Sequence, residues 1–264
     1  FFVLGTIFIG KVLRNPIKEV QDIEKFGLTV FGTVPFTKVS DRTNNKAKRL
    51  PLLGLHNPKD HSVEALRSLR TSLHFGMLDA KSKSIAITSA LPNSGKSFIS
   101  ANLAAVIAQS GHKVVVVDCD MRRGVIRKYF DCPADKKGLS DLLANDADLE
   151  TVLQKGPADN LYFIPAGKVP PNPSELLMRS EFQSVVERLV ADFEYVIFDT
   201  PPITLVSDAA IIAKYSGASL IVARQIETSH KEFETAIKAM ERAGGKFSGA
   251  ILNAVKHGDS AAKY

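Results

Sequence analysis

A lysine and a serine lie next to each other at the start of an apolar helical stretch, in residues 90–97 (ALPNSGKS). Their spacing is that of a phosphate loop, with Ala90 where the first glycine usually stands. In such a loop, backbone N–H groups and a helix N-terminus face the phosphates of a nucleotide, the lysine reaches the β and γ oxygens, and the serine holds Mg²⁺. The alternative is a Ser/Gly turn that only caps a helix. The predicted nucleotide contacts are Asn93, Ser94, Gly95, Lys96, Ser97 and Phe98.

Three aspartates at the ends of apolar runs are candidates for a metal site. VVVVDCD carries Asp118 and Asp120, and VIFDT carries Asp199. In an open parallel sheet, ligands bind beyond the carboxyl ends of the strands, so these carboxylates should converge on the phosphate loop. Mg²⁺ prefers oxygen ligands, and Ser97 with Asp199 is the minimal predicted set. Asp118 and Asp120 are additional predicted ligands, one of which could orient or deprotonate a nucleophile, although an aspartate after a strand is often only a turn former.

Two further residues, Arg224 and Asn253, end apolar runs on the same side. We expect them to approach the base or ribose of the nucleotide. The six histidines show no metal-ligand spacing, and the sequence contains no Ser-His-Asp or zinc pattern.

The elements that must position these residues alternate along the chain. Near-continuous Val/Ile runs separated by helical stretches predict an α/β fold, a P-loop NTPase-like parallel sheet with helices on both faces. The predicted strands are 84–90, 113–119, 161–167, 194–200, 218–224 and 248–255. The predicted helices are near 61–78, 96–110, 139–155, 174–192, 207–216 and 230–243.

Composition excludes several classes of protein. The chain has 264 residues, of which 45% are apolar and 23% charged, which does not fit a disordered, collagen-like or multi-span membrane protein. Two cysteines favour a reducing compartment. The net charge is +6, but residues 1–60 hold ten basic and five acidic residues, so the main body is nearly neutral. A basic nucleic-acid-binding surface is therefore not expected.

The basic excess follows an apolar start, FFVLGTIFIG, which is about half of a bilayer span. Lys11, Arg14 and Lys18 come directly after it, as basic residues do at the cytoplasmic ends of membrane helices. We interpret residues 1–10 as the inner end of a spanning helix; the alternative is an amphipathic helix packed on the domain.

Residues 61–256 resemble the cytoplasmic domain of bacterial tyrosine autokinases, which are attached to chain-length regulators of capsular and exopolysaccharide export. The resemblance rests on TSALPNSGKSFISANLAAVIAQSGHKVVVVDCDMRRG, PPNPSELL, VIFDTPPITLVSDAA, SLIVAR and GAILN. It implies use of Mg²⁺·ATP and transfer to tyrosines of a C-terminal cluster. Asp118 and Asp120 match a second, Asp-rich motif of this family and, with Lys96, form the expected catalytic set. Asp118 is the candidate that accepts the tyrosine proton.

The resemblance also gives an expected organisation. Residues 1–18 would be the end of a membrane helix with its basic flank, 19–60 a juxtamembrane region and linker, 61–256 the kinase domain, and 257–264 the start of a tail with Tyr264 as an acceptor. Expected partners are the tyrosine tail of a neighbouring subunit, a cognate tyrosine phosphatase and the polysaccharide export machinery, at the cytoplasmic face of the inner membrane. Nucleic acid is not expected.

A Glu-x2-Arg-x2-Arg helix before the first strand, another mark of the family, is matched by Glu64, Arg67 and Arg70. The resemblance implies that this helix joins subunits into a closed ring, an octamer, whereas a solvated helix flank is the simpler interpretation. The rival family is the chromosome-partitioning and division-site ATPases, which act as nucleotide-switched binding modules. They need a second lysine at the position that Leu91 occupies here.

The sequence departs from the family pattern after the Asp-rich run. Val125 stands near the position of an internal regulatory tyrosine, and Tyr129 follows four residues later. Gating by an internal phosphotyrosine is therefore doubtful. The basic residues of this stretch, Arg122, Arg123, Arg127 and Lys128, either pair with phosphate or form a solvated edge.

Overall fold

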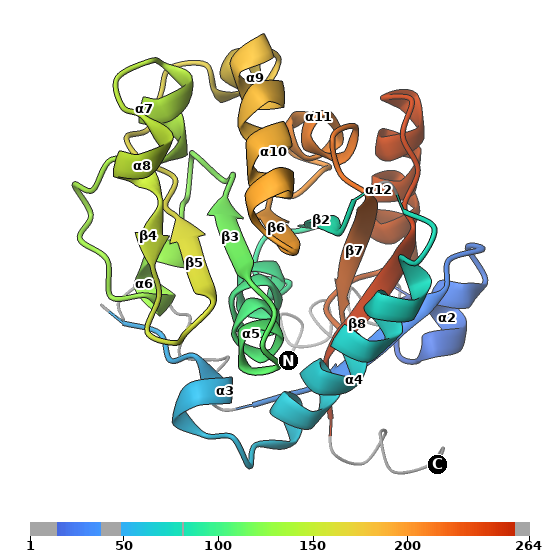
Figure 1. Ribbon diagram of the computed structural model, residues 1–264. Coiled ribbons are helices and arrows are strands. Elements are labelled where there is room, and N and C mark those ends of the chain that lie inside the picture. Colours follow the sequence, from blue (N-terminus) through green and yellow to red (C-terminus); the bar gives the residue numbers. More distant parts are fainter. Residues whose placement is uncertain (1–14, 38–48, 81, 257–264) are drawn as a thin grey trace, which may run out of the picture.

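The computed structural model describes residues 15–37, 49–80 and 82–256 (Figure 1). The predicted end of a membrane helix in residues 1–10 and the predicted acceptor Tyr264 lie outside these ranges. Within them, no helix is both long and apolar enough to cross a bilayer.

The described residues form one eight-stranded sheet in the order β1-β8-β7-β2-β6-β3-β5-β4. All neighbouring strands are parallel except the short edge pair β4 and β5. The strands are β1 Val30–Pro35, β2 Ser84–Ser89, β3 Val114–Asp118, β4 Gln154–Lys155, β5 Leu161–Ile164, β6 Tyr195–Asp199, β7 Ala218–Arg224 and β8 Gly249–Val255. The P-loop NTPase-like fold class and all six strands predicted after residue 84 are confirmed.

Alternate side chains of each strand enter opposite layers of core. Ile85 and Ile87 of β2 pack in one cluster, whereas Ala86 packs in another. The first cluster is covered by α3 Leu53–His56, α4 His61–Gly76, α5 Lys96–Gln109 and α6 Ile126–Tyr129. The opposite face is covered by α7 Leu139–Leu143, α8 Leu149–Val152, α9 Pro173–Leu177, α10 Ser180–Asp192, α11 Asp208–Ala213 and α12 His230–Arg242. Because both faces are buried, the central strands are mostly apolar, with polar side chains chiefly at their ends.

Two predicted helices are divided in the structure. The helix expected near 139–155 is replaced by α7, α8 and strand β4, because Asn145 adopts a left-handed backbone (φ 61°) and Asp148 caps a new helix through Thr151 N at 2.8 Å. The helix expected at 174–192 is divided into α9 and α10, since Arg179 has an extended backbone. In residues 174–192 the polar sequence keeps its helical periodicity on both sides of the break.

The described end of the expected juxtamembrane region and linker (19–60) packs on the domain. Leu50, Leu52 and Leu53 are buried, and α3 packs on α5. Two hydrogen bonds fix it: Leu53 N donates to Asn102 Oδ1 (2.6 Å), and Gln109 Nε2 donates to Gly54 O (2.8 Å). The apolar run PLLGL supplies the side chains that make this packing favourable.

The segment predicted to be juxtamembrane also packs on the sheet. Strand β1 pairs with β8, and Ile17 N donates to Thr228 O at 2.8 Å. A short helix, α2 Val20–Glu24, follows, and Phe26 next to it contacts Phe233 of α12 with ring centroids 5.4 Å apart. This N-terminal segment therefore lies near the carboxyl ends of β7 and β8.

Candidate functional site

The segment between β2 and α5 forms a tight loop whose backbone is in part left-handed. Asn93 has φ 62° and Gly95, the residue before α5, has φ 89°. A Cβ atom at Gly95 would lie 2.1 Å from Asn253 Nδ2, so both its backbone angle and its surroundings require glycine. The predicted strand–loop–helix arrangement is present, and the N-terminus of α5 faces the pocket.

Side chains from distant strands hold this loop. Asn253 on β8 is buried and donates its amide to Ser94 O at 2.9 Å. Arg224 on β7 donates to Asn93 O at 3.4 Å. Both residues also line the pocket, which is compatible with the predicted approach to a base or ribose. That approach stays a prediction. What the structure adds is that they position the loop.

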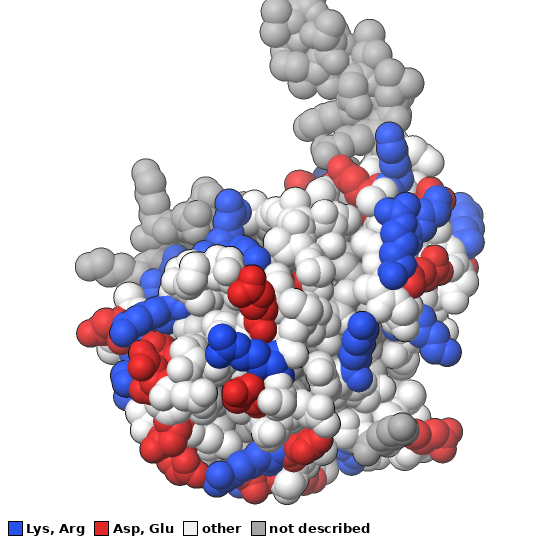
Figure 2. Space-filling model, turned by 90° about the horizontal axis from the view of Figure 1, so that it is seen from above, with Lys and Arg blue, Asp and Glu red and all other residues white. Residues whose placement is uncertain are grey.

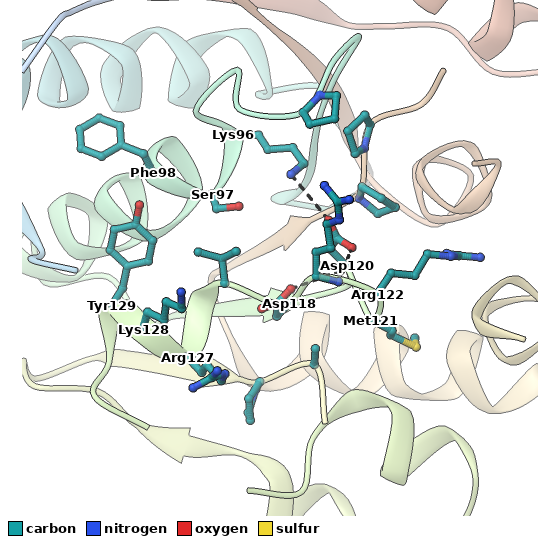
Figure 3. Close-up of a pocket in the computed structure, with 18 of the residues that line it drawn as sticks. Lys96, Ser97, Phe98, Asp118, Asp120, Met121, Arg122, Arg127, Lys128 and Tyr129 are labelled. Carbon is teal, nitrogen blue, oxygen red and sulfur yellow. Dashed lines mark hydrogen bonds and ion pairs between the residues drawn. The ribbon is translucent and has the colours of Figure 1, made fainter. Parts of the chain in front are cut away.

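The three predicted carboxylates meet at one edge of the sheet. Asp118 and Asp199 are register partners at the ends of β3 and β6, and Asp120 follows two residues later. Lys96 Nζ lies 3.8 Å from Asp120 Oδ2 and points toward it (Figure 3). A pocket of about 800 Å³ opens here, with Lys96, Ser97, Asp118 and Asp120 among its lining residues. This volume is in the range of small-molecule sites.

Asp199 has the features of a cation ligand. Its carboxylate is fully buried; Oδ1 accepts a hydrogen bond from Ser100 Oγ (3.1 Å), whereas Oδ2 has no partner. Burial raises its pKa to about 6, although the charge of Lys96 and the nearby Ser97 hydroxyl oppose the shift. A buried carboxylate oxygen without a partner is unfavourable unless a cation or proton occupies it. No group of three His, Cys, Asp or Glu side chains in the described ranges is arranged as a metal site. A fit to Mg²⁺, which keeps several waters, therefore rests on Asp199 and the adjacent Ser97.

Asp118 is held by the backbone that follows it. Its Oδ1 accepts from Asp120 N (3.2 Å) and its Oδ2 from Ile126 N (2.9 Å). Burial, and then the charge of Asp199, raise the pKa of Asp118 well above its usual value. A carboxylate with a raised pKa is a stronger base than an exposed one, so Asp118 is suited to accept a proton.

Sequence reasoning missed Ser100 and Asp208. Ser100 follows Lys96 by one helical turn, and this spacing was the available signal. Asp208 is fully buried and binds both Arg122, through an ion pair, and Ser174 Oγ. It thereby joins the loop after β3 to α9 and α11, a contact between distant segments that no local pattern indicates. Arg122 is thus paired with protein.

The residues predicted for oligomerisation lie on the outer flank of α4. Glu64 is exposed, Arg67 and Arg70 are half-buried, and Arg67 pairs with Glu64 within the helix.

Near the pocket, Val125 is among the lining residues and Tyr129 is buried, which raises the pKa of its hydroxyl. The other predicted contact, Phe98, lies at the base of the loop and is buried at the pocket wall.

The chain is similar to known proteins across the fold and the site. Residues 82–242 match the family described as AAA domain. The tyrosine-protein kinase ptk of Acinetobacter johnsonii is 40% identical over 259 residues, which cover 96% of this chain and 35% of that protein. The chain thus spans about a third of the length of the curated relatives it matches.

Two solved structures show the same architecture over nearly their whole length. The kinase domain of Escherichia coli tyrosine kinase ETK has a TM-score of 0.85 and 40% identity, covering 94% of this chain and 98% of that one. The BceF tyrosine kinase domain has a TM-score of 0.83 and 39% identity, covering 91% of this chain and all (100%) of that one. The phosphate loop, the paired strand-end aspartates and these relatives together show that the chain belongs to the family of bacterial tyrosine-kinase domains.

Proposed function

We propose that this chain is the kinase domain of an ATP-dependent protein-tyrosine autokinase. The observation that carries the proposal is the pair of buried aspartates, Asp118 and Asp199, at adjacent strand ends beside a glycine-dependent phosphate loop. The relatives named as tyrosine kinases support tyrosine as the acceptor.

Different residues bind the phosphates, the rest of the nucleotide and the metal ion. Lys96 and the loop N–H groups bind the β- and γ-phosphates, and Phe98, Arg224 and Asn253 complete the nucleotide site. Ser97 and Asp199 hold Mg²⁺, assisted by Asp120 and Asp118. When bound, Mg²⁺ neutralises charge on the phosphate oxygens. The partnerless Asp199 Oδ2 gives such an ion a ready ligand.

Transfer itself needs mainly positioning and charge stabilisation. The tyrosine oxygen forms a bond to the γ-phosphorus while the bond from that phosphorus to the β–γ bridging oxygen breaks, and ADP leaves. The hydroxyl proton passes to the Asp118 carboxylate, and Lys96 stabilises the charge that develops on the phosphates.

Transfer to a tail tyrosine such as Tyr264 runs in trans between subunits. The subunits form a closed ring, an octamer, in which the Glu64/Arg67/Arg70 flank of one reaches the next. The N-terminal segment attaches the ring to the cytoplasmic face of the inner membrane, where it acts in capsular or exopolysaccharide polymerisation and export. A cognate phosphatase reverses the modification, and heavy tail phosphorylation loosens the ring by like-charge repulsion.

The ring is tested by Arg67→Ala combined with Arg70→Ala. We expect a monomer that binds ATP but phosphorylates poorly, because truncation leaves the partner's charges unpaired at the contact. Light scattering measures the size. A double variant that remains a large oligomer with full activity would show that these residues are only a solvated helix flank.

The activity is tested by incubating a tail-complete chain with γ-labelled ATP and Mg²⁺, followed by phosphoamino-acid analysis. We expect stable label on tyrosine. Label released only as inorganic phosphate would contradict the kinase and favour a nucleotide-switched ATPase of the division-site type. Leu91 is at the position where that class needs lysine, and it packs against an apolar cluster.

A further inference from the structure

Four cations line the pocket on the side away from the phosphate loop. We call this set the basic wall; its members are Arg123, Arg127, Lys128 and Lys136. They come from α6 and the loops on either side of it. In Figure 3, Arg127 and Lys128 lie across the pocket from Lys96, with Asp118 between them.

None of these four side chains has an ion-pair partner among the described residues, which distinguishes them from nearby cations. Arg122 is paired with Asp208, and Arg49 with Asp131 at 3.4 Å. Seen from above (Figure 2), the surface of the molecule carries Lys and Arg intermixed with Asp and Glu. The positive charge of these four pocket-lining side chains is therefore not neutralised by an ion pair within the described residues.

In the proposed function, nucleotide binding does not require this charge. The phosphates of ATP are accounted for by the loop N–H groups, Lys96 and Mg²⁺, and Arg224 lies on the loop side as well. A cleft lined by one sign of charge focuses its field and attracts ligands of opposite charge. The basic wall therefore has an excess of positive charge that the nucleotide leaves available.

The position of the basic wall in the pocket indicates which kind of ligand it binds. In the proposed transfer, the acceptor hydroxyl has to reach Asp118 inside the pocket that the basic wall also lines. Two apolar side chains that line the same pocket are unusually exposed, Val169 by 69% and Leu205 by 61%. Cations together with exposed apolar side chains suit a peptide that carries both anionic and aromatic groups.

We propose that the basic wall binds the phosphoryl acceptor, and that this acceptor is a tyrosine in an anionic peptide segment, with carboxylates or phosphate esters next to the tyrosine. This inference rests on the proposed kinase function, because it names the substrate class of that same site. The acceptor's anionic groups contact Arg127 and Lys128 while its hydroxyl reaches Asp118.

The test measures peptide binding directly, by fluorescence anisotropy with Mg²⁺·ADP present and without any transfer. Labelled tyrosine peptides of equal length carry flanks of Glu, of Gln or of Lys, and a fourth carries Gln flanks and one phosphotyrosine. At low salt we expect the Glu peptide, the phosphotyrosine peptide or both to bind at least about tenfold more tightly than the Gln peptide, with the Lys peptide weakest. The arm that binds more tightly identifies carboxylate or phosphate as the source of the anion.

Arg127→Gln combined with Lys128→Gln should remove most of that preference and change the dissociation constant of ADP by less than about twofold. The matched control is Arg242→Gln with Lys246→Gln, two exposed cations that do not line the pocket. It changes the net charge equally and should keep the preference. Arg123→Gln with Lys136→Gln provides a second, independent variant of the wall.

Equal binding of all four peptides to the unaltered protein would overturn the inference, as would a preference that the control reduces as much as the wall variants do. An equal loss of ADP binding in the wall variants would assign the cations to the nucleotide instead. Because no phosphate is transferred, these outcomes are separate from failure of the kinase assay, which tests the proposed function alone.

Discussion

The two sides of the pocket are built in different ways. On the loop side, Gly95 and Asn93 adopt left-handed backbone angles, and buried Asn253 holds the loop through Ser94 O. On the basic wall, Arg123 and Lys136 are exposed, Arg127 and Lys128 are half-buried, and none has an ion-pair partner within the described ranges. The first side is fixed before any ligand arrives, whereas the second offers charge on long side chains.

This difference indicates different tasks. A preorganised loop suits a ligand of constant shape, such as the phosphates of a nucleotide, because its donors need no rearrangement. Solvated cations suit a ligand that varies in sequence, because exposed ion pairs are individually weak and tolerant of geometry. Substitutions on the two sides should therefore change different constants.

The largest expected effect is on the loop side. Lys96→Met should reduce phosphoryl transfer by at least about 10³-fold, since it removes the cation that stabilises charge on the phosphates. The fold should persist, because Lys96 contacts the pocket and Asp120 and is not part of the apolar core. Phosphotyrosine blotting and circular dichroism measure the two results. Unchanged phosphoryl transfer in a folded variant would show that the phosphate-loop assignment is wrong.

Asp118 lies between the two sides, so its variant should separate chemistry from binding. Asp118→Asn should lower the single-turnover transfer rate by about 10²- to 10⁴-fold, because the amide cannot accept the tyrosine proton. Nucleotide affinity should change much less. Rapid-quench measurement of one turnover, beside a nucleotide titration, distinguishes the two. An unchanged single-turnover rate would show that Asp118 is not the base.

The carboxylate of Asp199 should make the metal-free protein less stable as pH rises. Its pKa of about 6 in the folded state lies above the value of 3.8 in an unfolded chain, so folding takes up a proton between these values. The contribution of this group to stability is therefore greatest below about pH 4 and falls toward pH 7, by up to about 3 kcal/mol. Asp199→Asn should flatten that fall, and Mg²⁺ should restabilise only the unaltered protein.

Urea unfolding in EDTA at several pH values between 4 and 7.5 measures this effect, with the same series repeated in Mg²⁺. Equal pH profiles for the two proteins would show that the buried carboxylate is stabilised by something other than a proton or a cation.

The smallest effect should come from the side chain that supports the loop. Asn253→Ala removes the hydrogen bond to Ser94 O, which should weaken nucleotide binding about fivefold, since one buried hydrogen bond contributes about 1 kcal/mol. The matched control is Asn160→Ala, an exposed asparagine whose amide donates to Gly111 O at 3.3 Å. Calorimetric titration with ADP compares them. An affinity equal to that of the control would assign Asn253 no positioning role.

The loop side was predictable from sequence because its chemistry is local. The spacing from Ala90 to Ser97 and the strand-end position of Asp199 are visible without a fold, and alternating apolar runs predicted the parallel sheet. Long-range contacts were not predictable. The hydrogen bond from Asn253 to Ser94 joins residues 159 positions apart in the sequence, and Arg122 and Asp208, which form an ion pair, are 86 positions apart. The breaks at Asn145 and Arg179 were missed because helical periodicity continues across them.

The separation of tasks is tested most directly by measuring two constants in two variants. These are the dissociation constant of ADP and the KM for an anionic tyrosine peptide, each in Asn253→Ala and in Arg127→Gln/Lys128→Gln. We predict that the first variant weakens ADP binding about fivefold and leaves KM within about twofold, and that the second raises KM about tenfold and leaves ADP binding within about twofold. If both variants changed both constants to the same extent, the two sides would be one undivided site and the account would be wrong.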